Sequence, residues 1–331
     1  MTTIAITGGA GFLGSLLTRE LLDAADAGDA PLGFTKILSV DLRESPVEDP
    51  RVESVVGDFA DPEVLDRVIT EETAAIYHLA AVLSGGSAED FDLAMRVNVD
   101  GTRRVLEAAR ATGTCPMVLF TSSLAVFGGE VPEVVPDSWA AQPASTYGAF
   151  KAIGELLVNE YSRKGFVDGR VCRMPTISVR PGKPNSAASS FASGIIREPL
   201  QGVPAPCPVP RDTRLWLCSP ATAVRNLAAM LSVPGEALGS WRVLDMPGIS
   251  VTVQQMLDAL EAVAGAETRD LVYDEPDPRV AEIVCSWPGE FDISRALGLG
   301  LAVDEDFADV VRAHARLEQS PSGFLDPSSG S

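Results

Sequence analysis

Short apolar runs alternate with longer amphipathic stretches through the first half of the chain. The apolar runs predict strands at 3–7, 36–41, 52–58, 74–80, 116–122 and 169–177. They have no polar face, which indicates parallel strands buried on both sides. Apolar residues at helical spacing predict helices between them, at about 12–25, 62–71, 88–112 and 146–164. Repeated strand–helix units predict an α/β fold with a doubly wound parallel sheet.

The regular alternation stops after residue 177. Proline and glycine then cluster at 180–185 and 202–210, which indicates loops. We predict further helices at 188–200 and about 219–233, 252–265 and 304–317, with a strand near 241–246 that returns to the main sheet. The chain therefore divides into a sheet domain (1–177), a smaller interleaved capping part (178–319) and a tail (320–331). The Ser, Gly and Pro content of the tail predicts disorder.

Composition argues against several classes of function. A formal net charge of −20 disfavours nucleic acid or an anionic membrane as partner, because both require clustered Lys and Arg. No signal-peptide pattern and no membrane-spanning apolar run of about 20 residues is visible. Five scattered cysteines predict reduced thiols and a cytoplasmic protein. The two histidines, His78 and His314, lack spaced partners, so we expect no metal site. We expect His78 to be a buried structural residue.

A glycine-rich turn follows the first strand directly and opens the first helix. It reads Thr-Gly-Gly-Ala-Gly-Phe-Leu-Gly from residue 7, the spacing and context of a dinucleotide site. Glycines allow a tight turn and a close approach to a pyrophosphate at the helix N-terminus. We predict phosphate contacts from Gly8, Gly11, Phe12, Leu13 and Gly14.

Acidic residues at the next strand ends predict the remaining cofactor contacts. Asp41 can accept hydrogen bonds from the ribose hydroxyls of NAD. Opposite the extra phosphate of NADP it would face a like charge at ~4 Å, which costs on the order of 1–4 kcal/mol. We therefore expect NAD. Asp58 and Phe59 are placed beside the adenine, and the small residues Ala80 and Ala81 let the cofactor pass.

Three further residues predict proton transfer at an alcohol. Tyr147 and Lys151 are four residues apart on a predicted helix and so share one face. A tyrosine needs its pKa lowered from about 10 to act as a base at neutral pH. The lysine ammonium, aided by a positive nicotinamide ring, can lower it. Ser123 ends the fifth strand and can hold the substrate oxygen. Together these residues predict nicotinamide-dependent oxidation or reduction.

These motifs resemble those of the extended short-chain dehydrogenases/reductases. The matching segments are TGGAGFLG, Asp41, GD at 57–58, HLAA at 78–81, NVDGT at 98–102, SS at 122–123 and YGAFK at 147–151. The resemblance implies a Rossmann domain and a catalytic triad of Ser123, Tyr147 and Lys151. It also implies that Asn98 supports the Lys151 side of the cofactor site. We predict Pro175 as a further cofactor-binding residue. By the same resemblance, the outer faces of helices 88–112 and 146–164 pair in a homodimer.

A narrower likeness lies in the second half. Segments 179–200 and 210–220 are similar to those of D-erythronate dehydrogenases, which oxidise C2 of a four-carbon aldonate with NAD. This implies oxidation of a small sugar acid, D-erythronate to 2-dehydro-D-erythronate. A nucleotide-sugar epimerase or dehydratase of the same fold is the alternative. The chain departs from those enzymes in having Arg-Met-Pro-Thr at 173–176 where they usually carry Arg-Tyr-x-Asn, and in lacking a glycine-rich diphosphate-binding segment. A non-catalytic redox sensor would have little need for the triad.

A sugar acid needs a cation for its carboxylate and polar partners for its hydroxyls. We choose Arg214 for the carboxylate, because a guanidinium offers two parallel donors, with Arg180 and Lys183 as alternatives. Besides Ser123 and Tyr147, the candidates for the remaining polar contacts are Ser84, Gly85, Thr176, Asn185, Ser189 and Ser190.

Overall fold

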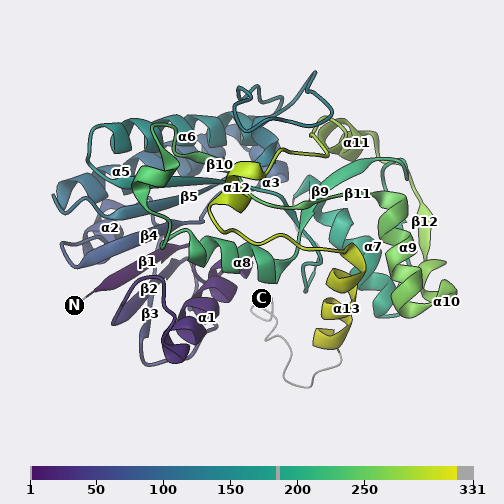
Figure 1. The fold of residues 1–331 in the computed structure, drawn as a ribbon, viewed down its shortest axis with the longest axis horizontal. Coiled ribbons are helices and arrows are strands. Elements are labelled where there is room, and N and C mark those ends of the chain that lie inside the picture. The colour runs from purple at the N-terminus through teal and green to yellow at the C-terminus, as the bar shows by residue number, and fades with distance from the viewer. Residues whose placement is uncertain (1, 184–186, 319–331) are drawn as a thin grey trace.

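The computed structural model describes residues 2–183 and 187–318. Within them, seven parallel strands form the central sheet in the order β10-β6-β5-β4-β1-β2-β3 (Figure 1). Their bounds are β1 Thr3–Thr7, β2 Lys36–Asp41, β3 Val52–Val56, β4 Thr73–His78, β5 Met117–Ser123, β6 Asp168–Met174 and β10 Val243–Asp245. The order reverses between β1 and β4, so the predicted doubly wound sheet is confirmed, and ligands bind such sheets at this reversal.

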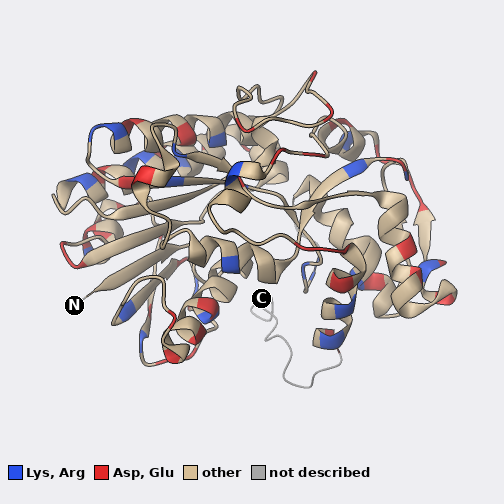
Figure 2. Cartoon of the chain, in the orientation of Figure 1, with Lys and Arg blue, Asp and Glu red and all other residues tan. Residues whose placement is uncertain are grey.

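Helices cover both faces of the sheet. The apolar stripe of α1 (Phe12–Ala27) packs with α8 (Pro220–Ala229) against one face, in a core that includes Leu17, Leu21 and Leu227. On the other face lie α2 (Pro62–Val68), α5 (Thr102–Ala111) and α6 (Thr146–Arg163). Charged residues lie mainly on the outer helices and loops (Figure 2), as expected where strands are buried on both sides.

The start of α6 is fixed by two local features. The Ser145 side chain caps the helix by accepting a hydrogen bond from the Gly148 N–H at 3.1 Å. A Cβ on Gly148 would lie 1.9 Å from the carbonyl oxygen of Ala125, so only glycine allows this close approach. The helix therefore begins directly against the turn that follows β5, and Tyr147 lies beside Ser123.

Several predicted elements are shorter or divided. The predicted strand 169–177 breaks at Pro175, which has no N–H for a sheet ladder. The residues that follow form β7 (Thr176–Ile177), which pairs with β9 (Arg214–Cys218) instead. The predicted helix 88–112 is four segments, because Asp90 caps a new helix after α3 (Ser84–Glu89). The others are α4 (Phe91–Ala94), a π-helical segment (Met95–Gly101) and α5. The strand 52–58 ends at Val56, so Asp58 lies in the following turn.

The second half adds one strand, β10, to the sheet and packs α8 against one of its faces. Other parts of this half build a separate core around residues such as Ile195, Leu215 and Leu257. A three-stranded sheet joins β7, β9 (Arg214–Cys218) and β11 (Ile249–Thr252), and β8 (Ala205–Cys207) pairs with β12 (Val272–Asp274). The helices are α7 Phe191–Leu200, α9 Val253–Ala264, α10 Ala266–Arg269, α11 Pro278–Val284, α12 Ser294–Gly298 and α13 Phe307–Glu318.

Three predictions from the sequence concern a membrane-spanning helix, a metal site and the tail of the chain. Across the described residues, no helix is long and apolar enough to cross a membrane, and no group of three or more His, Cys, Asp or Glu side chains is placed to hold a metal ion. The predicted disordered tail at 320–331 lies outside the described residues.

Candidate active site

A cavity of about 660 Å³ lies at the carboxyl ends of the central strands, where loops and α7 from the second half close over it. Its size suits a cofactor-scale ligand. Most of the site residues predicted from the sequence line it: Gly8, Gly11, Phe12, Leu13, Gly14, Asp41, Asp58, Phe59, Ala80, Ala81, Ser84, Ser123, Tyr147, Lys151, Pro175, Thr176, Ser189 and Ser190.

The glycine turn forms a cradle with room for a phosphate. No side chain caps the N-terminus of α1 at Gly11, so the first N–H groups of the helix carry the positive end of its dipole toward the cavity. A Cβ on Gly14 would lie 2.2 Å from the carbonyl oxygen of Gly8, so only glycine lets the helix approach the turn this closely. These features fit the pyrophosphate of a dinucleotide.

The two acidic strand-end residues are already held by the protein. Asp41 accepts hydrogen bonds from the N–H groups of Ala10 at 3.2 Å and Leu42 at 2.8 Å. Asp58 accepts from the Ala60 N–H and from Arg96, each at 2.9 Å. Burial acts to raise the pKa of Asp58, but these hydrogen bonds outweigh it and lower that pKa below its ordinary value. Both residues therefore present fixed carboxylates to the cavity.

Sequence reasoning missed two arginines at this end of the cavity. Arg43 and Arg96 both line it. Arg43 donates to the Ala10 carbonyl oxygen at 3.1 Å, and its place two residues after Asp41 was a signal in the sequence. Arg96 lies in the π-helical segment. The sequence pattern predicts a continuous α-helix there, so the direction of the Arg96 side chain could not be inferred.

Ser123, Tyr147 and Lys151 meet at the end of β5. Ser123 accepts from the Ala125 N–H at 3.2 Å and is hydrogen-bonded to Tyr147 through its side chain. The buried Lys151 Nζ donates to the Thr121 carbonyl oxygen at 2.6 Å. It lies 5.7 Å from the centroid of the Tyr147 ring. The structure thus brings the three predicted residues together.

Burial displaces the pKa values of the tyrosine and the lysine in opposite directions. It raises the pKa of Tyr147 to about 12, against the hydrogen bond with Ser123, which lowers it. It lowers the pKa of Lys151 to about 7, against the charge of Glu155, which raises it. The lowered tyrosine pKa that sequence analysis requires is therefore not supplied by the protein groups alone.

Two buried polar residues beside the site have structural partners. The Asn98 side chain accepts from the Val82 N–H at 2.8 Å and donates to its carbonyl oxygen at 3.0 Å. Its amide is occupied by this loop and Asn98 does not line the cavity, so its role as a cofactor contact stays a prediction. His78 lies between Thr7 at 2.7 Å and Thr102 at 2.9 Å. Burial lowers the pKa of His78 to about 3, so it is neutral and structural.

The structure does not bring Arg214, which we predict to bind the carboxylate, to the cavity. Arg214 does not line the cavity; it lies on β9, exposed, and donates to Ser250 at 3.2 Å. Arg180 lies there instead, with its guanidinium 5.7 Å from the centroid of the Phe12 ring. Among the described residues no carboxylate pairs with Arg180, and burial, together with the charge of Arg197, lowers its pKa. Asn185 lies outside the described residues.

One face of α7 supplies cavity residues that sequence reasoning overlooked. Ser193 and Arg197 line the cavity together with Ser189, and their spacing of four residues was a signal, because residues at this spacing share a helix face. Ser193 accepts from the Arg180 N–H at 2.9 Å, and Arg197 donates to the Arg180 carbonyl oxygen at 2.7 Å. This face therefore fixes the backbone of Arg180.

Comparisons with known proteins agree with this geometry. The family model described as "NAD dependent epimerase/dehydratase family" matches residues 4–217. A D-erythronate dehydrogenase of Cupriavidus necator is 52% identical over 94% of this chain and 97% of that protein. Another from Haemophilus influenzae is 46% identical over 93% and 97%.

Solved structures show the same fold. The crystal structure of a nucleoside-diphosphate-sugar epimerase from Agrobacterium tumefaciens matches with a TM-score of 0.90 and 38% identity, over 98% of this chain and 96% of that one. The glycine cradle and the strands β2, β3, β4, β5 and β6 of the central sheet lie within the matched residues 4–217. The chain belongs to the NAD dependent epimerase/dehydratase family.

Proposed function

We propose that this protein oxidises the C2 hydroxyl of D-erythronate to 2-dehydro-D-erythronate with NAD as acceptor, as a dehydrogenase of carbohydrate metabolism. The observation that carries the proposal is the 52% identity to a D-erythronate dehydrogenase across 94% of the chain. Residues 1–177 with β10 would form the NAD-binding part and residues 178–319 the substrate-binding part. The five cysteines, all free, support a cytoplasmic enzyme.

The cradle supports the cofactor assignment. Gly8, Gly11 and Gly14 leave space for a pyrophosphate beside the uncapped start of α1. The Asp41 carboxylate would accept from the adenosine ribose, and Asp58 with Phe59 would flank the adenine. When bound, the nicotinamide ring accepts a hydride and contributes positive charge near Tyr147, which lowers a tyrosine pKa.

Tyr147 is the proposed base. Its phenolate oxygen removes the proton from the substrate hydroxyl, while the Ser123 hydroxyl holds the same substrate oxygen. Lys151 contributes positive charge beside the phenolate, from a buried position where little water screens it. These roles follow from the contacts among the three side chains at the end of β5.

Arg180 is the proposed partner of the substrate carboxylate. It faces the cavity without a carboxylate partner of its own among the described residues, and burial already disfavours its charge. A bidentate carboxylate would satisfy that charge. Hydroxyl groups of Ser84, Thr176 and Ser189 line the same cavity and would receive the hydroxyls of the sugar acid.

The competing function is that of a nucleotide-sugar epimerase. The name of the Agrobacterium tumefaciens structure favours it, at 38% identity, but the two D-erythronate dehydrogenases are more similar at 52% and 46%. The reactions differ in a measurable way, because an epimerase returns its hydride to the sugar and a dehydrogenase releases NADH.

The test is NADH formation by the purified protein with a panel of D- and L-aldonates of four to six carbons, with NADP in parallel. We expect turnover of D-erythronate with NAD and far less with NADP. Conversion of a nucleotide sugar without net NADH, and silence on every aldonate, would contradict the proposal.

A further inference from the structure

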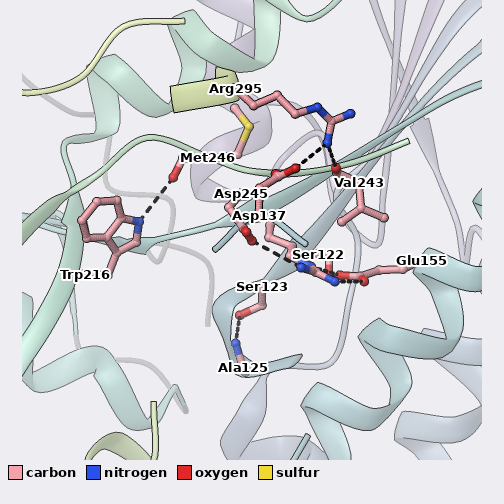
Figure 3. A network of polar contacts seen from close by, with 11 residues as sticks. Ser122, Ser123, Ala125, Asp137, Glu155, Trp216, Val243, Asp245, Met246 and Arg295 are labelled. Atoms are coloured by element: carbon pink, nitrogen blue, oxygen red, sulfur yellow. Dashed lines mark hydrogen bonds and ion pairs between the residues drawn. The ribbon is translucent and has the colours of Figure 1, made fainter. Parts of the chain in front are cut away.

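A row of buried polar side chains crosses three neighbouring strands beneath α6. In the register of the sheet, Ser122 on β5 lies opposite Arg173 on β6, and Arg173 lies opposite Asp245 on β10. All three are almost fully buried. Figure 3 shows Ser122, Asp245 and Glu155 of α6 converging on one network. It begins one residue from Ser123.

Glu155 is the centre of this network. Its carboxylate accepts from the Ser122 hydroxyl at 2.5 Å and from two guanidinium nitrogens of Arg173, at 2.9 and 2.8 Å. Its side chain is 2% exposed. Such a bidentate pair fixes both position and direction. Glu155 therefore has a single, well-defined place between α6 and the sheet.

The outer end of the network is held more loosely. The Asp245 carboxylate meets Arg173 only at 3.5 Å, and its second oxygen has no hydrogen-bond partner. Beyond it, Asp137 pairs with Arg295 at 2.9 Å, and Figure 3 shows Arg295 also reaching the Val243 carbonyl. Asp245 thus contributes little to fixing Glu155.

Glu155 also faces the proposed catalytic lysine. Tyr147, Lys151 and Glu155 follow one another at four-residue spacing on α6, so they form one stripe toward the sheet. The titratable groups that face Lys151 are Tyr147 and Glu155 from its own helix and His78 from β4, which is neutral. Arg173 and Asp245, from β6 and β10, meet the stripe through Glu155.

The effect on Lys151 is electrostatic. Burial alone favours the neutral amine, and the negative charge of Glu155 opposes it. One buried carboxylate therefore both anchors the strand end that carries Ser123 and favours the charged form of Lys151.

We propose that Glu155 is a positioning residue of the active site, which keeps Lys151 charged and holds the Ser122–Ser123 strand end in place through its pairing with Arg173. The inference rests on the proposed role of Lys151. It assigns no substrate contact to Glu155, because the carboxylate is enclosed by Ser122 and Arg173.

The charge of Lys151 can be measured without any substrate. The chain has four lysines, Lys36, Lys151, Lys164 and Lys183, so a ¹³C-lysine-labelled protein gives a simple NMR spectrum, in which loss of a signal in Lys151→Met identifies Lys151. In Glu155→Gln, the titration midpoint of the Lys151 signal should be lower by about one pH unit or more than in the wild type, because a nearby opposite charge shifts a pKa by about 1–3 units. Asp245→Asn, in the same network, is the matched control and should leave the midpoint unchanged.

A second variant separates the effect on Lys151 from loss of stability. Glu155→Gln leaves the buried Arg173 short of a partner, which is destabilising. The double change Glu155→Gln with Arg173→Gln removes both charges together, and the same lowered midpoint is expected. A midpoint equal to that of the wild type in both variants would overturn the proposal. An equal displacement in Asp245→Asn would also overturn it, since the network as a whole would then set the charge.

Turnover provides an independent readout. If charged Lys151 is the active form, activity is lost as pH rises through its pKa, so Glu155→Gln should lose activity at lower pH than the wild type while still binding NADH. An unchanged alkaline limb would count against the proposal. The NMR titration needs no turnover, so a failure of the proposed D-erythronate activity is distinguishable from a failure of this inference.

Discussion

Tyr147 is the residue on which the proposed chemistry depends. Its buried surroundings disfavour the phenolate, and the positive nicotinamide ring would favour it. Burial raises the pKa of Tyr147 to about 12. We expect Tyr147→Phe to lower kcat by at least ~10²-fold, because positioned acid–base groups contribute about 10²–10⁴-fold. Affinity for NADH, measured by fluorescence titration, should stay the same. Loss of NADH binding in this variant would instead indicate a structural role.

Arg180 is the residue on which substrate choice depends. A hydrogen bond to a charged group contributes about 1.5–3 kcal/mol, so Arg180→Met should raise KM for D-erythronate by roughly 10- to 100-fold. Arg214→Met is the matched control, because Arg214 lies outside the cavity lining. Steady-state kinetics of both variants test the assignment, and equal effects would refute it.

Site residues at the ends of strands or the starts of helices could be predicted from the sequence, and site residues positioned by loops could not. Gly14, Asp41, Ser123 and Tyr147 follow directly from a strand or open a helix, so their common edge could be inferred from topology. Arg214 was chosen by residue type alone. No pattern in the sequence shows that β9 carries it away from the cavity and that α7 fixes Arg180 there.

The cradle between β1 and α1 is the element that binds the cofactor most directly. A Cβ on Gly14 would lie 2.2 Å from the Gly8 carbonyl oxygen, and such overpacking costs about 1–3 kcal/mol. We expect Gly14→Ala to weaken NADH binding by roughly tenfold or more, measured by calorimetry. Gly33→Ala, which would meet nothing within 4 Å, should bind NADH as the wild type does; similar losses in both would contradict the cradle.

Among elements, the buried parallel strands were the easiest to predict. Strands such as 3–7 and 36–41 are continuous apolar runs, and the structure has them with the same bounds. Short partly exposed strands such as β8 and β12 are set by tertiary pairing and leave no period in the sequence. The π-helical turn at Met95–Gly101 has the apolar spacing of an ordinary helix.

For the whole molecule, we propose a homodimer in which the outer faces of α6 and of the helices within 88–112 pair. On α6, Ile153 is 38% exposed and Leu156 is 60% exposed. Light scattering should give twice the 34.9 kDa of one chain, and Leu156→Glu should give the monomer. Leu297→Glu, on the exposed part of α12, is the control. A monomeric wild type would exclude the dimer.

Stability should depend on pH through Asp245. Burial raises the pKa of Asp245 from 3.8 to about 7, so its stabilising contribution is fully present below pH 3.8 and is lost as pH rises to about 7. Between pH 5 and 7 the free energy of unfolding of Asp245→Asn should gain about 1–3 kcal/mol relative to the wild type. Urea denaturation at both pH values measures this gain. A difference that stays constant would contradict the assigned pKa.

Hydride removal from C2 of D-erythronate can be followed with deuterium at that carbon. D-Erythronate deuterated at C2 is incubated with NAD and the wild-type protein, and the NADH is analysed by mass spectrometry. We expect one deuterium in the NADH, unlabelled 2-dehydro-D-erythronate as product, and almost no reaction in Tyr147→Phe. NADH formed without deuterium, or no NADH at all, would contradict it.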